Sequence, residues 1–353
     1  MPISTKWLSL IVLSLATPLQ ASENIRTVRD LSGRWQFQRV GAKTWKAVTV
    51  PSTFQSHEGN EFHGIGWYTK TLDPFEIPKG KRALLHFQAA ATLAEVWWNG
   101  EKLGSHLGGW TPFRFDVTDL VKKAPKDKPH EIRVKLDEKV GHNTQGFLPI
   151  IEPHYGGLWQ GVQLLIVPET YFDDLRVLAI GNVDRSAFEL ELPRLGKRAG
   201  EVSQIEFLYR LRGDTEWSRI PIDTKELEHD RLLELVSTFK SWSPQEPNLY
   251  ECKARLFLKE EREPVDEITF RAAFRKIEAK EDQLLLNGKP LQVRGILNWG
   301  YYPPNLAPNP SEKQMRQDIE LAKSMGFNLM KFCLWMPPKR FFELCDEMGF
   351  LAW

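Results

Sequence analysis

The chain has 353 residues, enough for two or three domains of roughly 100–200 residues each. Its hydrophobic content of 42% and charged content of 26% are those of an ordinary globular protein. A formal net charge of +1 creates no field that would attract nucleic acid or an anionic membrane surface, which excludes both as electrostatic partners.

The N-terminus resembles a secretory signal. Lys6 precedes an apolar run from Trp7 to Leu19, and small residues follow it. The run is shorter than the roughly 20 residues that span a bilayer, and it lacks the amphipathic pattern of a buried helix. We therefore expect residues 1–21 to be a signal peptide, cleaved after Ala21, and the protein to be exported to the periplasm or the outside.

Only three cysteines are present, Cys252, Cys333 and Cys345. Their odd number and uneven spacing give neither a disulfide framework nor a metal-ligand pattern. Cys252 lies in an alternating strand pattern and Cys345 on the apolar face of a helix pattern, so we expect both to be small core residues. No phosphate-binding loop or cofactor motif is present either, so no cofactor and no metal are expected.

Short strands and turns fill residues 22–168. Asn99-Gly100 separates two strand patterns and signals a two-residue hairpin. Apolar and charged residues alternate from Glu131 to Leu136, as in a half-buried strand. The chain carries 13 Trp, a residue common in β-sandwich cores, and no helical pattern of useful length occurs in this region. An all-β sandwich is predicted.

A second β region covers residues 169–275. Period-2 alternation marks three strands, Phe188–Leu192, Ile205–Leu211 and Tyr250–Leu258, and polar turns separate them. This spacing is typical of an immunoglobulin-like sandwich.

The pattern changes in residues 276–353. A strand ending near Leu297 is followed by a helix with Ser311 as its N-cap and Gln314 completing a capping box. A near-continuous apolar run, a second helix and a third strand follow. The expected apolar face of the first helix comprises Met315, Ile319, Ala322 and Met325. Strands that alternate with helices predict a parallel sheet, and the middle strand is expected to be covered on both faces.

Six strings in this order resemble glycoside hydrolase family 2, which includes β-galactosidases, β-glucuronidases and β-mannosidases. The resemblance runs from about residue 30 to the end of the sequence. The strings are VWWNGEKLGSHLGGWTPFRFDVTDLV, HYGGLWQGVQLLIVP, WSPQEPNLYECKARL, FRKIEAKEDQLLLNGKPLQVRGIL, MRQDIELAKSMGFNLMKF and FFELCDEMGFLAW.

The resemblance implies a mainly β, multidomain fold. Residues 22–168 would form a jelly-roll sugar-binding domain, residues 169–275 an immunoglobulin-like sandwich, and residues 276–353 the start of a truncated (β/α)8 barrel. It also implies a retaining, exo-acting hydrolase of O-glycosyl bonds, whose partner is a β-linked carbohydrate or glycoconjugate. A homo-oligomer is left open.

The resemblance further implies a sugar pocket at the barrel mouth. By position, its substrate-binding residues would be Asn298, Trp299, Tyr301, Lys331 and Trp335. The chain departs from the family here, because Trp299-Gly300 replaces the usual His-Glu and Lys331 replaces an Arg. The galactoside or glucuronide specificity is therefore not carried over, and an aromatic-rich pocket that also includes Tyr302 is implied instead. Packing of the barrel mouth remains the alternative role of these aromatic residues.

No catalytic residue can be assigned. A retaining glycosidase needs two carboxyl groups about 5–5.5 Å apart, and barrel enzymes place them at the C-terminal ends of strands. The two expected strand ends, residues 298–300 and 334–336, carry no carboxylate, and acidic residues such as Asp318 lie on helices. Residues 276–353 are about a third of the roughly 250 residues of a whole barrel. In the family, both catalytic glutamates come from later strands, so we expect no hydrolysis by this chain alone.

Two alternatives remain. One is a non-catalytic carbohydrate-binding protein that uses surface aromatics of the first sandwich. The other is one half of a split glycosidase, completed by a separate chain. The candidate surface aromatics are Trp97, Trp98, Trp110 and Trp159, although adjacent strand residues point to opposite faces, so only one of Trp97 and Trp98 can be exposed.

Overall fold

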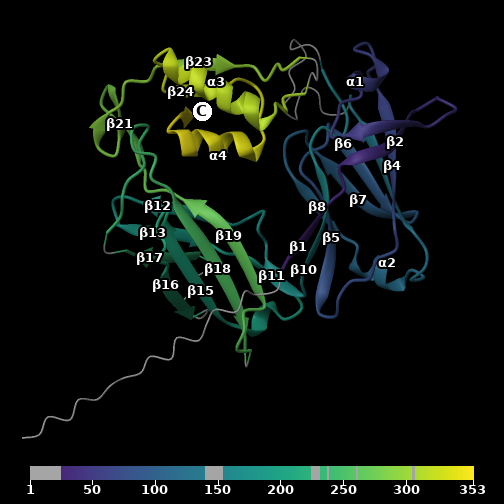
Figure 1. Ribbon diagram of the computed structural model, residues 1–353, viewed down its shortest axis with the longest axis horizontal. Coiled ribbons are helices and arrows are strands. Elements are labelled where there is room, and N and C mark those ends of the chain that lie inside the picture. The colour runs from purple at the N-terminus through teal and green to yellow at the C-terminus, as the bar shows by residue number, and fades with distance from the viewer. Residues whose placement is uncertain (1–24, 140–153, 224–230, 237, 260, 304–306) are drawn as a thin grey trace, which may run out of the picture.

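The computed structural model describes residues 25–139, 154–223, 231–236, 238–259, 261–303 and 307–353 (Figure 1). The expected signal peptide lies outside these residues. The described chain is mainly β and forms three bodies in chain order. No helix within the described ranges has the length and apolar character needed to cross a membrane.

The first body consists of two antiparallel sheets that share one core. Its six-stranded sheet has the order β3 (Lys46–Val50), β2 (Gly33–Arg39), β4 (Ile65–Leu72), β9 (His130–Asp137), β6 (Leu93–Trp98) and β7 (Glu101–Leu107). Its four-stranded sheet has the order β1 (Thr27–Asp30), β10 (Val162–Pro168), β5 (Lys81–Phe87) and β8 (Phe113–Asp116). Two short helices, α1 (Gln55–Glu58) and α2 (Thr118–Lys123), join strands. Large side chains from both sheets, Trp35 and Phe87 among them, fill the space between them.

Local turn chemistry sets the β6–β7 hairpin as predicted. Asn99 and Gly100 both have positive φ angles, 51° and 84°, which a two-residue turn of this kind requires. The strand before it also behaves as expected, since Trp98 is fully buried and Trp97 faces outward, half-buried. Among the other candidate surface aromatics, Trp159 was wrongly placed, because it is a core residue.

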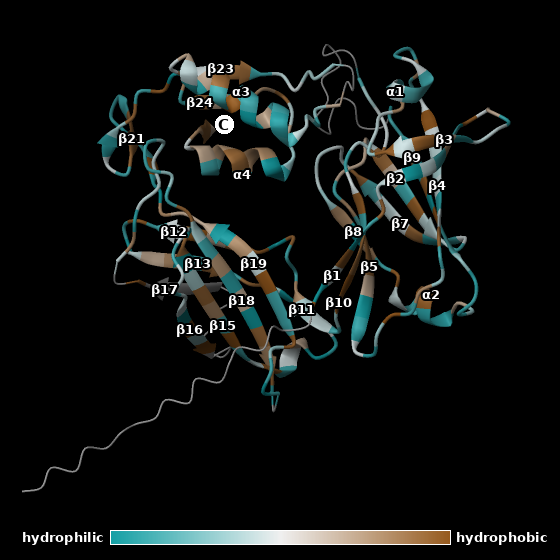
Figure 2. Ribbon diagram, viewed as in Figure 1, coloured by the Kyte–Doolittle hydropathy of each residue, from teal (hydrophilic) through white to brown (hydrophobic). Residues whose placement is uncertain are grey.

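The second body also has two antiparallel sheets on one core. The three-stranded sheet is β12 (Leu178–Asn182), β13 (Ala187–Glu191) and β17 (Arg231–Leu235), and the four-stranded sheet is β16 (Ser218–Asp223), β15 (Val202–Leu211), β18 (Tyr250–Leu258) and β19 (Asp266–Ala272). A small pair, β11 (Thr170–Phe172) and β14 (Arg194–Gly196), and a 3-10 turn, η1 (Ala199–Glu201), flank them. Apolar and polar residues alternate along β18, whose inward residues include Cys252 (Figure 2).

The third body contains the predicted parallel sheet. After the small antiparallel sheet β20 (Ile277–Lys280), β21 (Gln283–Leu286) and β22 (Lys289–Pro290), the parallel strands are β23 (Gly295–Asn298), β24 (Leu329–Phe332) and β25 (Leu351–Ala352). The helices α3 (Glu312–Ser324) and α4 (Lys339–Met348) connect them. The Ser311 hydroxyl caps α3 by accepting from the amide of Gln314 at 3.2 Å, as the capping pattern predicts.

One face of this parallel sheet is covered and the other is open. Side chains of α3 and α4, Ile319 and Phe341 among them, bury one face. On the other face Leu297 of β23 is 55% exposed, and Leu329 and Lys331 of the middle strand β24 are only half-buried. The expectation of a middle strand covered on both faces is therefore wrong for the described chain. The expected inward position of Met325 is also wrong, since its side chain is 64% exposed beyond the last turn of α3. Both residues lie where no described element packs on them.

The third body rests on the second through Trp242. This side chain is fully buried, and its Nε1 donates to the carbonyl oxygen of Asp346 in α4 at 2.8 Å. It packs with Leu249 and with Leu351 of β25. Arg275 adds an ion pair to the Asp346 carboxylate at 2.6 Å. In Figure 1, α4 accordingly lies directly above the strands of the second body.

Arg26 joins the first body to the second. Its guanidinium donates to both carboxylate oxygens of Asp266, at 2.8 and 2.6 Å, and to Asp174 at 2.8 Å. Asp266 is fully buried and also accepts from the amide of Phe172 at 2.8 Å. Arg114 of β8 pairs with Asp174 from the side of the first body, at 2.8 Å. The junction is therefore a charged network around one buried carboxylate.

His86, next to this network, should make the stability of the protein decrease at acid pH. Burial, and next the positive charge of Arg114, lower the pKa of His86 to about 4, despite the nearby Asp174. The pKa of a histidine in the unfolded chain is about 6.5. As the pH is lowered from there to about 4, His86 takes up a proton in the unfolded chain but not in the folded one, so the free energy of unfolding decreases over this range. We expect wild type to lose about 2–3 kcal/mol more than His86→Gln between pH 7 and pH 4.5. Urea unfolding at the two pH values checks this, and an equal loss in both proteins would contradict it.

Candidate active site

The sequence-derived site residues gather around the end of β23. Asn298 ends this strand, and its side-chain amide donates to the hydroxyl of Tyr302 at 2.8 Å. Its carboxamide oxygen accepts from the amide of Gly300 at 2.8 Å, which turns the chain sharply after the strand. The turn leaves Trp299 and Tyr301 52% and 59% exposed.

A cavity of about 520 Å³ runs along the free edge of β23 beside α3. Asn298, Trp299 and Tyr301 all line it, so three of the five expected site residues share one cavity. The rest of its wall is Tyr302 and Pro303 after the strand, Ile296, Leu297 and Met330 in the sheet, and Gln314, Asp318, Leu321, Ala322 and Met325 from α3 and its end.

The other two expected residues lie elsewhere. Trp335 is buried against Phe332 and Phe341. Its Nε1 donates to the main-chain oxygen of Asn298 at 2.8 Å, so it holds the end of β23 in place. Lys331 is in register with Leu297, which lies on the open face of the sheet. Its ammonium lies 4.5 Å from the ring centroid of Trp353, a cation–π arrangement.

Sequence reasoning missed a polar chain beneath the cavity. The Tyr302 hydroxyl donates to Asp318 at 2.9 Å, and the side-chain amide of Gln314 donates to the other carboxylate oxygen at 2.7 Å. Burial raises the pKa of Tyr302, which keeps its hydroxyl protonated as a donor. The separation of Gln314 and Asp318 by four residues on a helix was the available signal. Asp318 is thereby held in a structural role.

The cavity can bind but does not contain a carboxylate pair. Asp318 is the one carboxylate among its lining residues, and both of its oxygens already accept hydrogen bonds. Exposed aromatic rings beside an amide suit the C–H faces and hydroxyls of a sugar. Across the described ranges, no group of three or more His, Cys, Asp or Glu side chains is placed to hold a metal ion.

The first body reaches the loop that follows the site. The side-chain amide of Asn309 donates to the main-chain oxygen of Trp159 at 3.0 Å, and Ala307 packs with Tyr155 and Trp159. Trp110, half-buried, packs against both this group and the core of the third body. Segments far apart in the sequence therefore meet near the end of β23.

Comparison with known proteins finds one family in the first body and relatives along most of the chain. Residues 16–134 match the sequence model described as "Glycosyl hydrolases family 2, sugar binding domain". A β-galactosidase of Thermoanaerobacter pseudethanolicus is 27% identical over 92% of the chain, and a putative β-glucuronidase of Formosa agariphila is 23% identical over 98% of it. Residues 16–134 therefore match a family 2 sugar-binding domain, and the chain is similar to family 2 enzymes over most of its length.

The fold of the chain also matches solved structures. The FMN-binding β-glucuronidase from Facaelibacterium prausnitzii L2-6 superposes with a TM-score of 0.77 at 23% identity, over 93% of this chain and 52% of that one. The chain spans 44% and 43% of the lengths of the two curated relatives.

Proposed function

We propose that this chain is the N-terminal part of an exported, retaining, exo-acting β-glycoside hydrolase. In this proposal residues 22–168 are its jelly-roll sugar-binding domain, residues 169–275 its immunoglobulin-like sandwich, and residues 276–353 the start of its catalytic (β/α)8 barrel. The family match and the two parallel strand–helix–strand units of the third body support this reading.

The observation that carries the proposal is the open parallel sheet. Among the described strands, β23 and β25 each have one parallel neighbour, β24, so each presents a free edge there. The exposed Leu321 and Met325 beside the β23 edge, and the exposed Leu297 on the open face, are apolar groups suited to burial. Further strand–helix units would cover all of these groups, and such units complete a (β/α)8 barrel.

Sugar recognition is assigned to Asn298, Trp299, Tyr301, Lys331 and Trp335. Trp299 and Tyr301 supply exposed aromatic faces, Asn298 an amide, and Lys331 a cation on the open face of the sheet, where a closed barrel has its interior. Trp335 acts through the Asn298 main chain as a positioning residue. Because the relatives are named for β-galactosides and β-glucuronides, the proposed substrate class is a β-linked carbohydrate.

Hydrolysis assays test this proposal. Pure 353-residue protein is incubated with nitrophenyl β-galactoside and nitrophenyl β-glucuronide, with the Thermoanaerobacter β-galactosidase as positive control. We expect no turnover above the uncatalysed rate, because two carboxyl groups about 5–5.5 Å apart are required and the candidate cavity has only Asp318. Measurable turnover by the chain alone would overturn the assignment of its catalytic groups to later strands.

A non-catalytic carbohydrate-binding role is the second candidate. It is favoured by the match of residues 16–134 to a sugar-binding domain together with the single carboxylate in the candidate cavity. Calorimetric titration with common mono- and disaccharides distinguishes the two, since silence across the panel removes this candidate and leaves the first untouched.

A further inference from the structure

A short connection and a small contact join the first body to the second. β10 of the first body passes into β11 of the second with only Glu169 between them (Figure 1). Three apolar side chains of the first body pack on Tyr171 of β11, namely Leu84, Leu165 and Val167. Relative motion of two domains is the ordinary expectation unless their interface is large and apolar. The ionic contacts at this joint therefore decide how firmly the two bodies are held together.

Arg114 on β8 makes the ionic contact that crosses the joint from the sheet. Its two terminal nitrogens each donate to a carboxylate oxygen of Asp174, in the turn after β11, at 2.8 Å. Its Nε donates to Nδ1 of His86 on β5 at 3.2 Å. A guanidinium is a rigid planar fork, so a bond to Nε fixes the direction of the other two. His86 thereby directs Arg114 toward the second body.

One cation and one anion, from two different bodies, face His86. β8 contributes Arg114 and the main chain of Phe113, which hydrogen-bonds the ring, and the second body contributes Asp174. On β10 the register partner of His86 is Gln163, which does not titrate. The charged groups next in line are Arg82 and Asp116, which pair with each other, Asp30, which is in register with Gln163, and Arg26, which pairs with Asp174.

A proton on Nδ1 of His86 conflicts with the closed joint. Nδ1 would become a donor on a cation, and it would face a second donor on a second cation at 3.2 Å. Burial, and next the charge of Arg114, accordingly lower the pKa of His86 to about 4 in the closed arrangement. When Arg114 moves away and water reaches the ring, this pKa returns toward about 6.5. The open joint therefore binds the proton more tightly, and lowering the pH from about 6.5 to about 4 favours opening.

We propose that this joint is an acid-operated hinge between the first and second bodies. Uptake of one proton by His86 releases Arg114 from both His86 and Asp174. The first body then turns about the β10–β11 connection, while Arg26 stays paired with Asp266. The same motion withdraws Trp159 from the Asn309 loop near the candidate site. Acid thereby separates the first body from the loop that follows β23.

Distances between the two bodies in the full 353-residue chain test the hinge. Nitroxide labels are attached at two exposed positions, Lys122→Cys in α2 and Arg262→Cys between β18 and β19. Cys333→Ser removes the half-buried thiol, and the other two native thiols are buried. Pulsed electron paramagnetic resonance gives the distance distribution at pH 7 and at pH 4.5. We expect one distance at pH 7, and a ratio of shifted to original population at least ~10-fold higher at pH 4.5.

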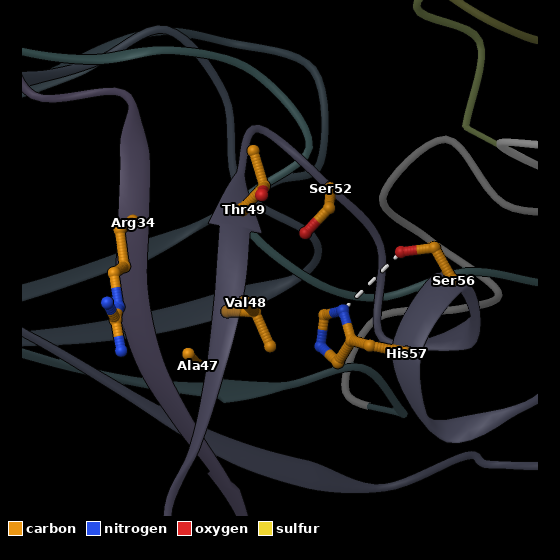
Figure 3. A pocket seen from close by; sticks show the side chains of 7 residues that line it. All are labelled: Arg34, Ala47, Val48, Thr49, Ser52, Ser56 and His57. Atoms are coloured by element: carbon orange, nitrogen blue, oxygen red, sulfur yellow. Dashed lines mark hydrogen bonds between the residues drawn. The ribbon is translucent and has the colours of Figure 1, made fainter.

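Three histidine variants in this labelled chain identify the proton site. His86→Gln keeps a neutral acceptor for Arg114 and cannot be protonated, so it should show one distance at both pH values. His86→Lys puts a permanent cation beside Arg114 and should show the shifted population already at pH 7. His57→Gln is the matched control, since burial lowers the pKa of His57 to about 4 as well, but His57 lies on α1, well apart from β11 (Figures 1 and 3). It should respond to acid as the parent chain does.

A label pair within the second body, Glu216→Cys with Arg262→Cys, should keep its distance at pH 4.5, because both positions are exposed on one body. If this pair changes as much as the first pair, acid unfolds the whole chain and the proposal is overturned. It is also overturned if the parent chain gives the same distribution at both pH values, if His86→Gln responds to acid, if His57→Gln does not, or if His86→Lys stays closed at pH 7. No glycoside is involved, so these outcomes are independent of the hydrolysis assay.

Discussion

Replacing Arg26 by alanine is expected to lower the free energy of unfolding by about 3–5 kcal/mol. Asp266 is fully buried, and Arg26 donates to both of its carboxylate oxygens. Without the guanidinium this carboxylate keeps only the Phe172 amide as a hydrogen-bond donor within the described chain, so a largely uncompensated charge remains inside the protein. Urea unfolding at pH 7, followed by tryptophan fluorescence, measures the change.

Arg29→Ala is the control, since Arg29 lies three residues away on β1, exposed and without an ion pair in the described chain. It should change the stability by no more than about 0.5 kcal/mol. A second variant separates charge from packing: Arg26→Met with Asp266→Leu removes both charges and should recover more than half of the loss. If the single and double variants are equally unstable, the buried charge is not the cause.

Replacing Trp242 by alanine should be similarly costly, about 3–5 kcal/mol, because it empties a fully buried site. The change also removes the hydrogen bond from Nε1 to the Asp346 main chain and the contact with Leu351. The third body should therefore loosen from the second. Denaturant unfolding gives the energy, and hydrogen exchange of the α4 amides reports the loosening.

Trp217→Ala is the control for Trp242→Ala, because both variants remove the same side-chain volume. This tryptophan is half-buried and lies under Arg210 and Lys253, 4.5 and 5.0 Å from its ring centroid. Cation–π contacts at such sites contribute about 0.5–1 kcal/mol each, so its loss should cost far less. Faster exchange in α4 after Trp217→Ala, or unchanged exchange after Trp242→Ala, would show that Trp242 does not hold the third body.

Features set by neighbouring residues were predictable from the sequence. Asn99-Gly100 determines its hairpin through backbone angles that few other pairs adopt, and Ser311 caps α3 through a hydrogen bond three residues away. The parallel sheet followed from strands and helices that alternate, since a parallel connection needs a crossover. The buried Cys252 and Cys345 followed from periodicity in the same way.

Features set by distant residues were not predictable. Arg26 and Asp266 are 240 positions apart, and nothing near either residue indicates the other. Exposure of Met325 depends on which elements pack beside α3, information that helical periodicity does not contain. The hollow beside β3 that Ser52 and His57 line (Figure 3) was not predictable either, because α1 has only four residues, too few for a helical period.

The links between the three bodies share an asymmetry. Trp242, Asn309 and Arg26 each donate from a side chain to a main-chain oxygen across a junction, at Asp346, Trp159 and Phe172. A main-chain oxygen is present whatever residue occupies the accepting position. For these particular bonds, substitution is restricted on the donor side and tolerated on the acceptor side, so the partners need not change together. Paired substitutions across the junctions are therefore expected at the ion pairs, such as Arg26–Asp266 and Arg275–Asp346, and not at these three bonds.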